Sequence, residues 1–271
     1  MRVKSILGVA LIAVMSIACG KDVDNSKVDG PEIQEPQTLY VKAIKAYNGM
    51  PGYSDYDSSL AFDIDSEKRI TSIRSTWSEE GVEYSDPVIS IEYGEGTAVI
   101  SYSMDGESGN IHCELNDKGA IVRATYDGDM AGMVEEFTYN DAGEIQKYVA
   151  CYANFSSMKL RYEWRDGNIY KVYYEDSEDK FTFTHEYTTE PNLYNIDIFP
   201  GCTLSTPIIC ELALPVNDGL LGKKNRGFLT SVGYDGYAIP IFDYIFKANG
   251  ELEYATMDED GYMVFECFEV L

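Results

Sequence analysis

Three turns of one type recur along the chain at a fixed interval, and this repeat limits the folds open to it. Gly119, Gly143 and Gly167 are spaced 24 residues apart, each after Asn or Asp residues and two positions before an Ile. Asn and Asp side chains hold hairpin turns, and Gly takes the positive φ that closes them. Because two strands and two turns fill 24 residues, the repeat predicts a succession of β-hairpins.

The runs between the turns alternate in polarity as strands do. Phe181, Phe183, His185 and Tyr187 share one face of an expected strand, opposite a face of polar residues. Only residues 39–47 are equally compatible with a helix. The sequence therefore predicts an all-β fold, a long antiparallel meander of a dozen or more strands. Because open sheets of more than about ten strands curl or split, we expect a curled sheet or half-barrel.

One segment, residues 190–227, interrupts this pattern. It contains four prolines and the apolar run 208–214, and such a run needs a surface to bury against. The concave face of a curled sheet is the natural surface, so we expect an irregular covering segment there. Residues 38–271 are thus predicted to form a single β-rich domain that includes this segment.

The charge and residue types exclude some classes of function. The chain has 46 Asp and Glu against 21 Lys and Arg, a formal charge of -25, which excludes nucleic acid as a partner. It has only 2 His and no cluster of His and Cys at metal-ligand spacing. We therefore expect no metal, no cofactor and no enzyme activity. The 22 Tyr residues favour strands.

The N-terminal residues predict export and a lipid anchor. Arg2 and Lys4 precede an apolar run of about twelve residues, too short to span a bilayer, so residues 1–18 are predicted to be a signal peptide. Ala18 followed by Cys19 resembles the lipobox of bacterial lipoproteins, which implies lipidation of Cys19 and attachment to a membrane through the lipid. Ser16 stands where lipoboxes usually have Leu. Residues 19–37 are polar and are expected to form a flexible tether.

The residues after Cys19 indicate to which membrane of the cell envelope the protein is attached. Gly20 replaces the Asp that resembles an inner-membrane retention signal, which favours the outer membrane. Lys21, Asp22 and Asp24 resemble the stretch that accompanies surface export in Bacteroidota lipoproteins. We therefore expect an outer-membrane, lipid-anchored protein at the cell surface, with the periplasmic face as the alternative.

Several motifs together resemble a Bacteroidota lipoprotein family catalogued only as a domain of unknown function. They are the lipobox, the Asn/Asp-x-Gly-x-Ile hairpins, residues 195–198 (Asn-Ile-Asp-Ile), residues 221–225 (Leu-Gly-Lys-Lys-Asn) and a closing hairpin around Gly250. The chain departs from this family at residues 225–229. The resemblance implies a β-rich envelope protein and supplies no catalytic residues.

Aromatic residues near the third repeat are candidates for ligand binding. Tyr162, Trp164, Tyr170 and Tyr173 fall in adjacent expected strands, beside carboxylates. Aromatic rings stack on sugar faces while Asp and Glu accept hydroxyl protons, so this pattern suits a glycan. Cross-strand aromatic pairing is the structural alternative for each of them.

Other candidate sites have simpler interpretations. Cys202 and Cys210 flank a seven-residue loop and can form a disulfide in an oxidising envelope, with buried thiols as the alternative. Residues 127–132 begin like a calcium loop, but Ala131 replaces a ligand, so a hairpin turn is the better interpretation. His185 is expected in the core.

These observations favour one class of function over a second. We expect a non-catalytic binding or scaffold lipoprotein whose partner is a glycan or another envelope protein. The alternative is a glycoside hydrolase that uses two carboxylates, for which their separation would decide.

Overall fold

A computed structural model describes residues 38–48, 56–79, 82–104, 107–151, 157–197, 219–256 and 261–267. These residues form seventeen strands and one short 3-10 helix, η1 (Gly128–Met130). The strands are β1 (Val41–Asn48), β2 (Tyr56–Ile64), β3 (Ile70–Glu79), β4 (Val82–Gly94), β5 (Thr97–Met104), β6 (Glu107–Leu115), β7 (Ile121–Tyr126), β8 (Val134–Tyr139), β9 (Ile145–Cys151), β10 (Met158–Arg165), β11 (Asn168–Glu175), β12 (Lys180–Pro191), β13 (Gly227–Tyr234), β14 (Tyr237–Pro240), β15 (Asp243–Phe246), β16 (Leu252–Thr256) and β17 (Gly261–Cys267).

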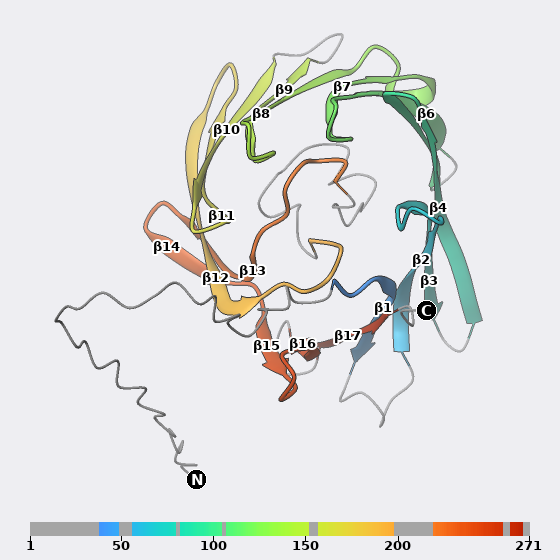
Figure 1. Ribbon diagram of the computed structural model, residues 1–271, viewed down its shortest axis with the longest axis vertical. Coiled ribbons are helices and arrows are strands. Elements are labelled where there is room, and N and C mark those ends of the chain that lie inside the picture. The colour runs from blue at the N-terminus through green and yellow to red at the C-terminus, as the bar shows by residue number, and fades with distance from the viewer. Residues whose placement is uncertain are drawn as a thin grey trace, which may run out of the picture. The chain divides into compact units, whose positions relative to one another are not determined.

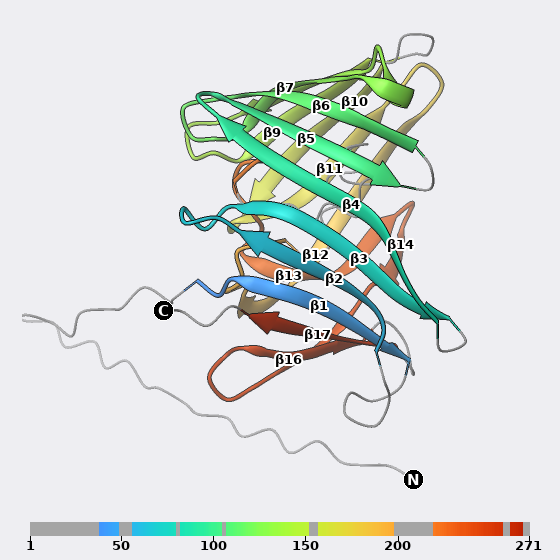
Figure 2. The ribbon, with the colours of Figure 1, turned by 90° about the vertical axis from the view of Figure 1, so that its right-hand side faces the viewer.

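The strands make one antiparallel meander that curls round on itself. Each strand from β1 to β14 pairs with the next, as do β15 to β17, and the first strand also pairs with the last, with Ile44 opposite Phe265. Within the described residues, β14 and β15 are the one pair of chain neighbours without a paired register, so the curl stays open there (Figure 1). Figure 2 shows the strands crossing the side of this curl one after another. The all-β prediction is confirmed.

The described chain contains no helix long and apolar enough to cross a membrane. Residues 39–47, where helix and strand were both compatible with the sequence, contribute to β1. Leu39, just before that strand, forms a parallel bridge with Tyr194. The first strand is therefore held by β2, by β17 and, at its start, by residues that follow β12.

The hairpin turns have the geometry that their residues favour. Gly119, Gly143 and Gly167 have φ of 82°, 83° and 83°, a region that side chains with a Cβ rarely occupy. In the first turn the Asn116 side-chain oxygen accepts hydrogen bonds from the N–H groups of Lys118 (2.9 Å) and Ala120 (3.0 Å). Asn140 holds the second turn in a similar way, accepting from the N–H of Glu144 at 3.0 Å.

The core lies on one face of the sheet, and strand alternation builds it. In β10, Leu160 and Tyr162 are buried while the residues between and beside them, such as Arg161 and Glu163, are exposed. His185 is 4% exposed, as predicted for a core position. One carboxylate, Glu135, is fully buried with this core and accepts hydrogen bonds from the hydroxyls of Tyr126 and Tyr148.

The described ends of the irregular segment, residues 192–197 and 219–226, lie within the curve of the sheet (Figure 1). Ile196 is 0% and Leu221 1% exposed, and burial of such a side chain stabilises a fold by about 1.5–3 kcal/mol. These ends bury apolar groups against the sheet as expected of a covering segment. Residues 198–218, with the predicted Cys202–Cys210 bridge and the apolar run, lie outside the described residues.

Two sequence motifs meet in a buried polar network, through residues 195–197 of the first and residues 221–225 of the second. Asn225 is 1% exposed, and its side chain accepts from the N–H of Ile169 (2.7 Å) and donates to the Asp197 carboxylate (2.5 Å). Lys224 donates to the carbonyl oxygens of Asn192 (2.6 Å) and Tyr194. The network ties both ends of the irregular segment to each other and to the start of β11.

Candidate functional site

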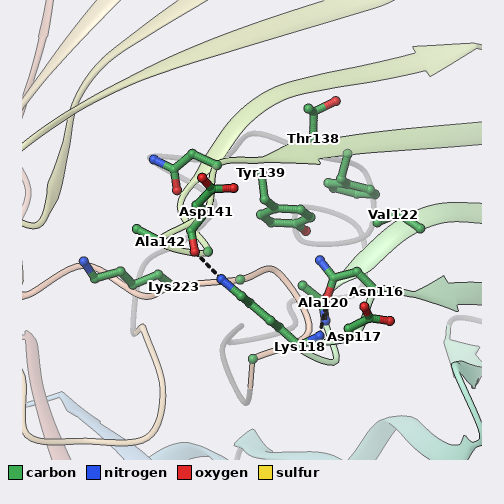
Figure 3. Close-up of a pocket in the computed structure, with 15 residues that line it drawn as sticks. Asn116, Asp117, Lys118, Ala120, Val122, Thr138, Tyr139, Asp141, Ala142 and Lys223 are labelled. Carbon is green, nitrogen blue, oxygen red and sulfur yellow. Dashed lines mark hydrogen bonds between the residues drawn. The ribbon is translucent and has the colours of Figure 1, made fainter.

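Two pockets adjoin at the end of the sheet where the hairpin turns of the 24-residue repeat lie side by side. The first has a volume of about 540 Å³ and lies between the β6–β7 turn, the β8–β9 turn and residues 219–223 (Figure 3). The second has a volume of about 420 Å³ and lies between the β8–β9 turn and β10 and β11. Asn140 lines both pockets.

Two polar side chains of the first pocket, Lys118 and Tyr139, form hydrogen bonds within the protein. The Lys118 ammonium donates to the carbonyl oxygen of Asp141 and so joins two successive turns (Figure 3). The Tyr139 hydroxyl donates to the carbonyl oxygen of Ile121 at 2.9 Å, and burial raises the pKa of this phenol. The first pocket therefore lies at a junction where Lys118 and Tyr139 tie successive turns together.

The second pocket, called the aromatic pocket below, combines rings with carboxylates. Three of the four predicted aromatic residues, Tyr162, Trp164 and Tyr170, line it together. Its other lining residues are polar, namely Asn140, Glu144, Gln146, Glu163 and Arg165. Rings that supply apolar faces, next to amides and carboxylates that accept hydroxyl protons, form the combination expected of a sugar-binding pocket.

The aromatic rings are held in place by the strands around them. The Trp164 indole N–H donates to the carbonyl oxygen of Ile145 on β9 at 2.7 Å, which fixes the ring against the neighbouring hairpin. The Arg165 guanidinium lies 3.6 Å from the centre of the Tyr170 ring. Tyr162 is only 5% exposed, so it contributes to the pocket wall more than to an accessible stacking face.

Glu144 carries a fixed negative charge into the aromatic pocket. Its carboxylate accepts hydrogen bonds from the Asn140 amide (2.9 Å) and the Lys223 ammonium (2.9 Å). These two partners hold the pKa of the Glu144 carboxyl below its ordinary value despite some opposing desolvation. Glu144 is therefore an ionised acceptor at neutral pH.

The structure separates Tyr173 from the other three candidates. Tyr173 lines a different hollow on the same sheet, with Lys147, Arg161 and Lys180. Its hydroxyl donates to Glu163 at 2.8 Å, and this hydrogen bond raises the pKa of the phenol. A hydrogen bond to Glu163, which lines the aromatic pocket, thus connects Tyr173 with that pocket.

Sequence reasoning missed the polar half of the aromatic pocket. Glu144 and Gln146 flank Ile145 in the second repeat, at the start of the strand next to that of Trp164, and Lys223 comes from the irregular segment. The 24-residue period was the available signal, because it repeats the turn of residues 140–144 at residues 164–168, and both turns contribute side chains to the aromatic pocket.

The other candidate sites have structural roles. Asp127 accepts from the N–H of Asn110 (2.5 Å), from its amide (3.2 Å) and from the His112 ring (3.2 Å), and these bonds lower the pKa of the Asp127 carboxyl. Residues 128–130 form η1, so the turn interpretation of this loop is supported over a calcium loop. Over the residues that the structure describes, no three His, Cys, Asp or Glu side chains are grouped as a metal site would require. Cys19 lies outside those residues.

Comparison with known proteins gives structural neighbours only. No protein-family model and no curated protein matches the sequence. The crystal structure of a porin-like protein from Bacteroides uniformis ATCC 8492 is similar, with a TM-score of 0.65 and 14% identity, over 84% of this chain and 100% of that one. A porin-like protein from Bacteroides vulgatus ATCC 8482 has a TM-score of 0.52 and 10% identity, over 86% and 100%. At these identities the likeness shows a shared fold.

Proposed function

We propose that this chain is a non-catalytic binding module of the bacterial envelope that recognises a glycan in the aromatic pocket. The observation that carries the proposal is that Tyr162, Trp164 and Tyr170 line one pocket with the carboxylates of Glu144 and Glu163. Its volume, about 420 Å³, is in the range that holds a small organic ligand.

The envelope location rests on two independent supports. The residues around Cys19 resemble a lipobox, and the structural neighbours from Bacteroides are described as porin-like. We infer a lipid anchor at Cys19 and attachment to the outer membrane, with the binding domain displayed beyond the tether. A partner protein of the envelope is the alternative ligand for the same module.

A glycan-array screen with residues 20–271, which lack the lipid, tests the proposal. Trp164→Ala and Tyr170→Ala should weaken binding of any ligand found by about tenfold, since aromatic anchors in pockets dominate binding energies. Tyr237→Ala is the matched control, because Tyr237 is an aromatic residue 75% exposed on β14. Glycan binding that survives both pocket substitutions would refute the assignment of the site.

A glycoside hydrolase is the second candidate, because two carboxylates line the aromatic pocket. Such enzymes need one carboxyl group that is protonated at the working pH to act as the general acid. Glu144 does not suit that role, since Asn140 and Lys223 lower its pKa. Cleavage of a polysaccharide by the purified chain, abolished in Glu163→Gln, would favour the enzyme over the binding module.

A further inference from the structure

The hollow that Tyr173 lines, here called the cationic hollow, lies across β9, β10, β11 and β12 and has a volume of about 420 Å³. Four basic side chains line it, Lys147, Lys159, Arg161 and Lys180, with Glu175 as its one carboxylate. All four are exposed. The chain as a whole carries a formal charge of -25, so this excess of positive charge in one hollow is opposite in sign to the charge of the whole protein.

Strand register places like charges directly opposite each other in the hollow. Arg161 on β10 pairs with Lys147 on β9. Side chains directly opposite in an antiparallel pair have Cβ atoms about 4.5–5.5 Å apart, and like charges there are destabilising. Neither side chain has an ion-pair partner within the described chain. The folded protein therefore keeps a repulsion that an anionic ligand would relieve.

In the neighbouring cross-strand row of the cationic hollow, positive and negative side chains lie opposite each other. Glu175 lies opposite both Lys159 on β10 and Lys180 on β12. The Lys180 ammonium lies 3.0 Å from the Glu175 carboxylate, and this pairing lowers the pKa of the Glu175 carboxyl. Charges alternate along this row, whereas the row of Lys147 and Arg161 continues into Tyr173 and Thr182, which bring no negative charge.

The Arg161 side chain is held in place before any ligand arrives. Its guanidinium lies 4.2 Å from the centre of the Tyr173 ring. The Tyr173 hydroxyl is in turn hydrogen-bonded to Glu163, which limits motion of the ring. A contact with an aromatic face uses no N–H donor of the guanidinium, so these donors remain available to an oxyanion.

We propose that the cationic hollow binds an oxyanion, specifically a phosphate ester group, between Lys147, Lys159 and Arg161. Arg donates two parallel hydrogen bonds to phosphate oxygens, and Lys adds point charges at the rim. A phosphate ester carries one negative charge as a diester and up to about two as a monoester, and either offsets the Lys147–Arg161 repulsion. Because the rest of the molecule is acidic, the ligand carries isolated phosphate groups rather than a continuous polyanion. This site is independent of glycan binding in the aromatic pocket.

Calorimetric titration of the full-length chain in detergent tests the proposal with three soluble probes, namely inorganic phosphate, glucose 6-phosphate and glucose. The two phosphates should bind and glucose should not. Arg161→Gln and Lys147→Gln should each weaken phosphate binding by about tenfold. Arg123→Gln is the matched control, since Arg123 is an exposed arginine on β7 that pairs with Glu114. It should bind phosphate as the wild type does.

Two further measurements separate the outcomes. Without phosphate, Lys147→Gln should melt at or above the wild-type temperature, because the like-charge pair is gone; a normal fold then rules out unfolding as the cause of lost binding. Binding to vesicles of phosphatidylglycerol, compared with vesicles of phosphatidylcholine, identifies the source of the phosphate. A lipid headgroup is supported if the protein binds only the phosphatidylglycerol vesicles and if Arg161→Gln abolishes that binding. If no phosphate probe or vesicle binds, or if both variants bind as the wild type does, the proposal is wrong.

Discussion

The main-chain N–H of Lys223 donates a 2.8 Å hydrogen bond to the carbonyl oxygen of Gly143, and three residues later the N–H of Arg226 donates a 3.0 Å bond to Gly167. Gly143 and Gly167 close successive turns of the repeat, two strands apart. Two strand spacings are about 9.6 Å, and three residues of extended chain span about 10 Å. The irregular segment therefore matches the pitch of the hairpin turns, and Leu220 continues the series by accepting from the N–H of Ile121 at 2.7 Å.

Gly222 tests how closely the irregular segment fits the turns. Gly219 and Gly222 have φ of 84° and 81°, but a Cβ on Gly222 would lie 2.4 Å from the Gly143 oxygen, whereas a Cβ on Gly219 meets nothing within 4 Å. Gly219→Ala should therefore cost about 1 kcal/mol in unfolding free energy for its backbone strain alone. Gly222→Ala should cost roughly 2 kcal/mol more because of overpacking. Denaturant unfolding measures both, and equal losses would mean that the approach at Gly222 is not tight.

The buried polar network around Asn225 should contribute more to the unfolding free energy than an exposed turn hydrogen bond does. Asn225→Ala removes the bonds to the Ile169 N–H and the Asp197 carboxylate in a buried site, which should cost about 3 kcal/mol. Asn249→Ala, in the exposed turn before β16, removes one 3.2 Å bond to the N–H of Glu251 and should cost less than about 1 kcal/mol. Similar losses for the two variants would show that the network does not tie the irregular segment to the sheet.

Lys224 should give stability a distinctive pH dependence. Burial lowers the pKa of its ammonium to about 8, partly offset by Asp197, whereas the unfolded chain has a pKa of about 10.4. Between these values the unfolded state binds a proton that the folded state has released, so unfolding free energy should rise with pH. The thiols of Cys113 and Cys267 act in the opposite direction, because burial raises the pKa of each, to about 12 and about 11.

The difference between wild type and Lys224→Met isolates the lysine. Unfolding free energies measured from pH 7 to pH 10 should show that the wild type gains about 1–2 kcal/mol relative to the variant above pH 8. At pH 7 the comparison gives the loss of the hydrogen bonds to Asn192 and Tyr194 and of the attraction to Asp197, offset by relief of the ammonium's desolvation. Parallel pH profiles would contradict the assignment of a lowered pKa to Lys224.

Much of the fold could be predicted from the sequence because its signals are local. Gly143 and its Asn140 partner specify a turn by their own chemistry, and alternation along β12 indicates which residues face the core. Residues 39–47 were compatible with helix and strand because the pairing that decides, with β2 and β17, involves partners far along the chain. The open edge between β14 and β15 had no signal in the sequence.

The candidate site was only partly visible in the sequence. The rings of Trp164 and Tyr170 were found because they cluster within one hairpin. Glu144 and Lys223 were not, since one comes from the preceding repeat and the other from the irregular segment, 79 residues further on. Tyr173 was grouped with the other rings by sequence proximity, yet alternation and the irregular register after Glu163 place it in the cationic hollow.

The cysteines should differ widely in reactivity. Cys151 is exposed, whereas Cys113 is buried and has a pKa raised to about 12 by desolvation and by Glu135. Because the thiolate is the reactive form, Cys151 should be alkylated by iodoacetamide at pH 8 far faster than Cys113. Peptide mass spectrometry over a time course measures both rates within one sample. Rapid labelling of Cys113 in the folded chain would contradict its place in the core.

The measurement that most directly tests glycan recognition uses the fluorescence of Trp164 itself. The chain has 2 Trp residues, Trp77 and Trp164, so a Trp77→Phe variant leaves Trp164, in the aromatic pocket, as the only indole that reports. Titration with a glycan found by the array should change its emission saturably, with the same dissociation constant as calorimetry gives. Calorimetric binding of that glycan with no change in Trp164 emission would show that the aromatic pocket is not where this protein binds its ligand.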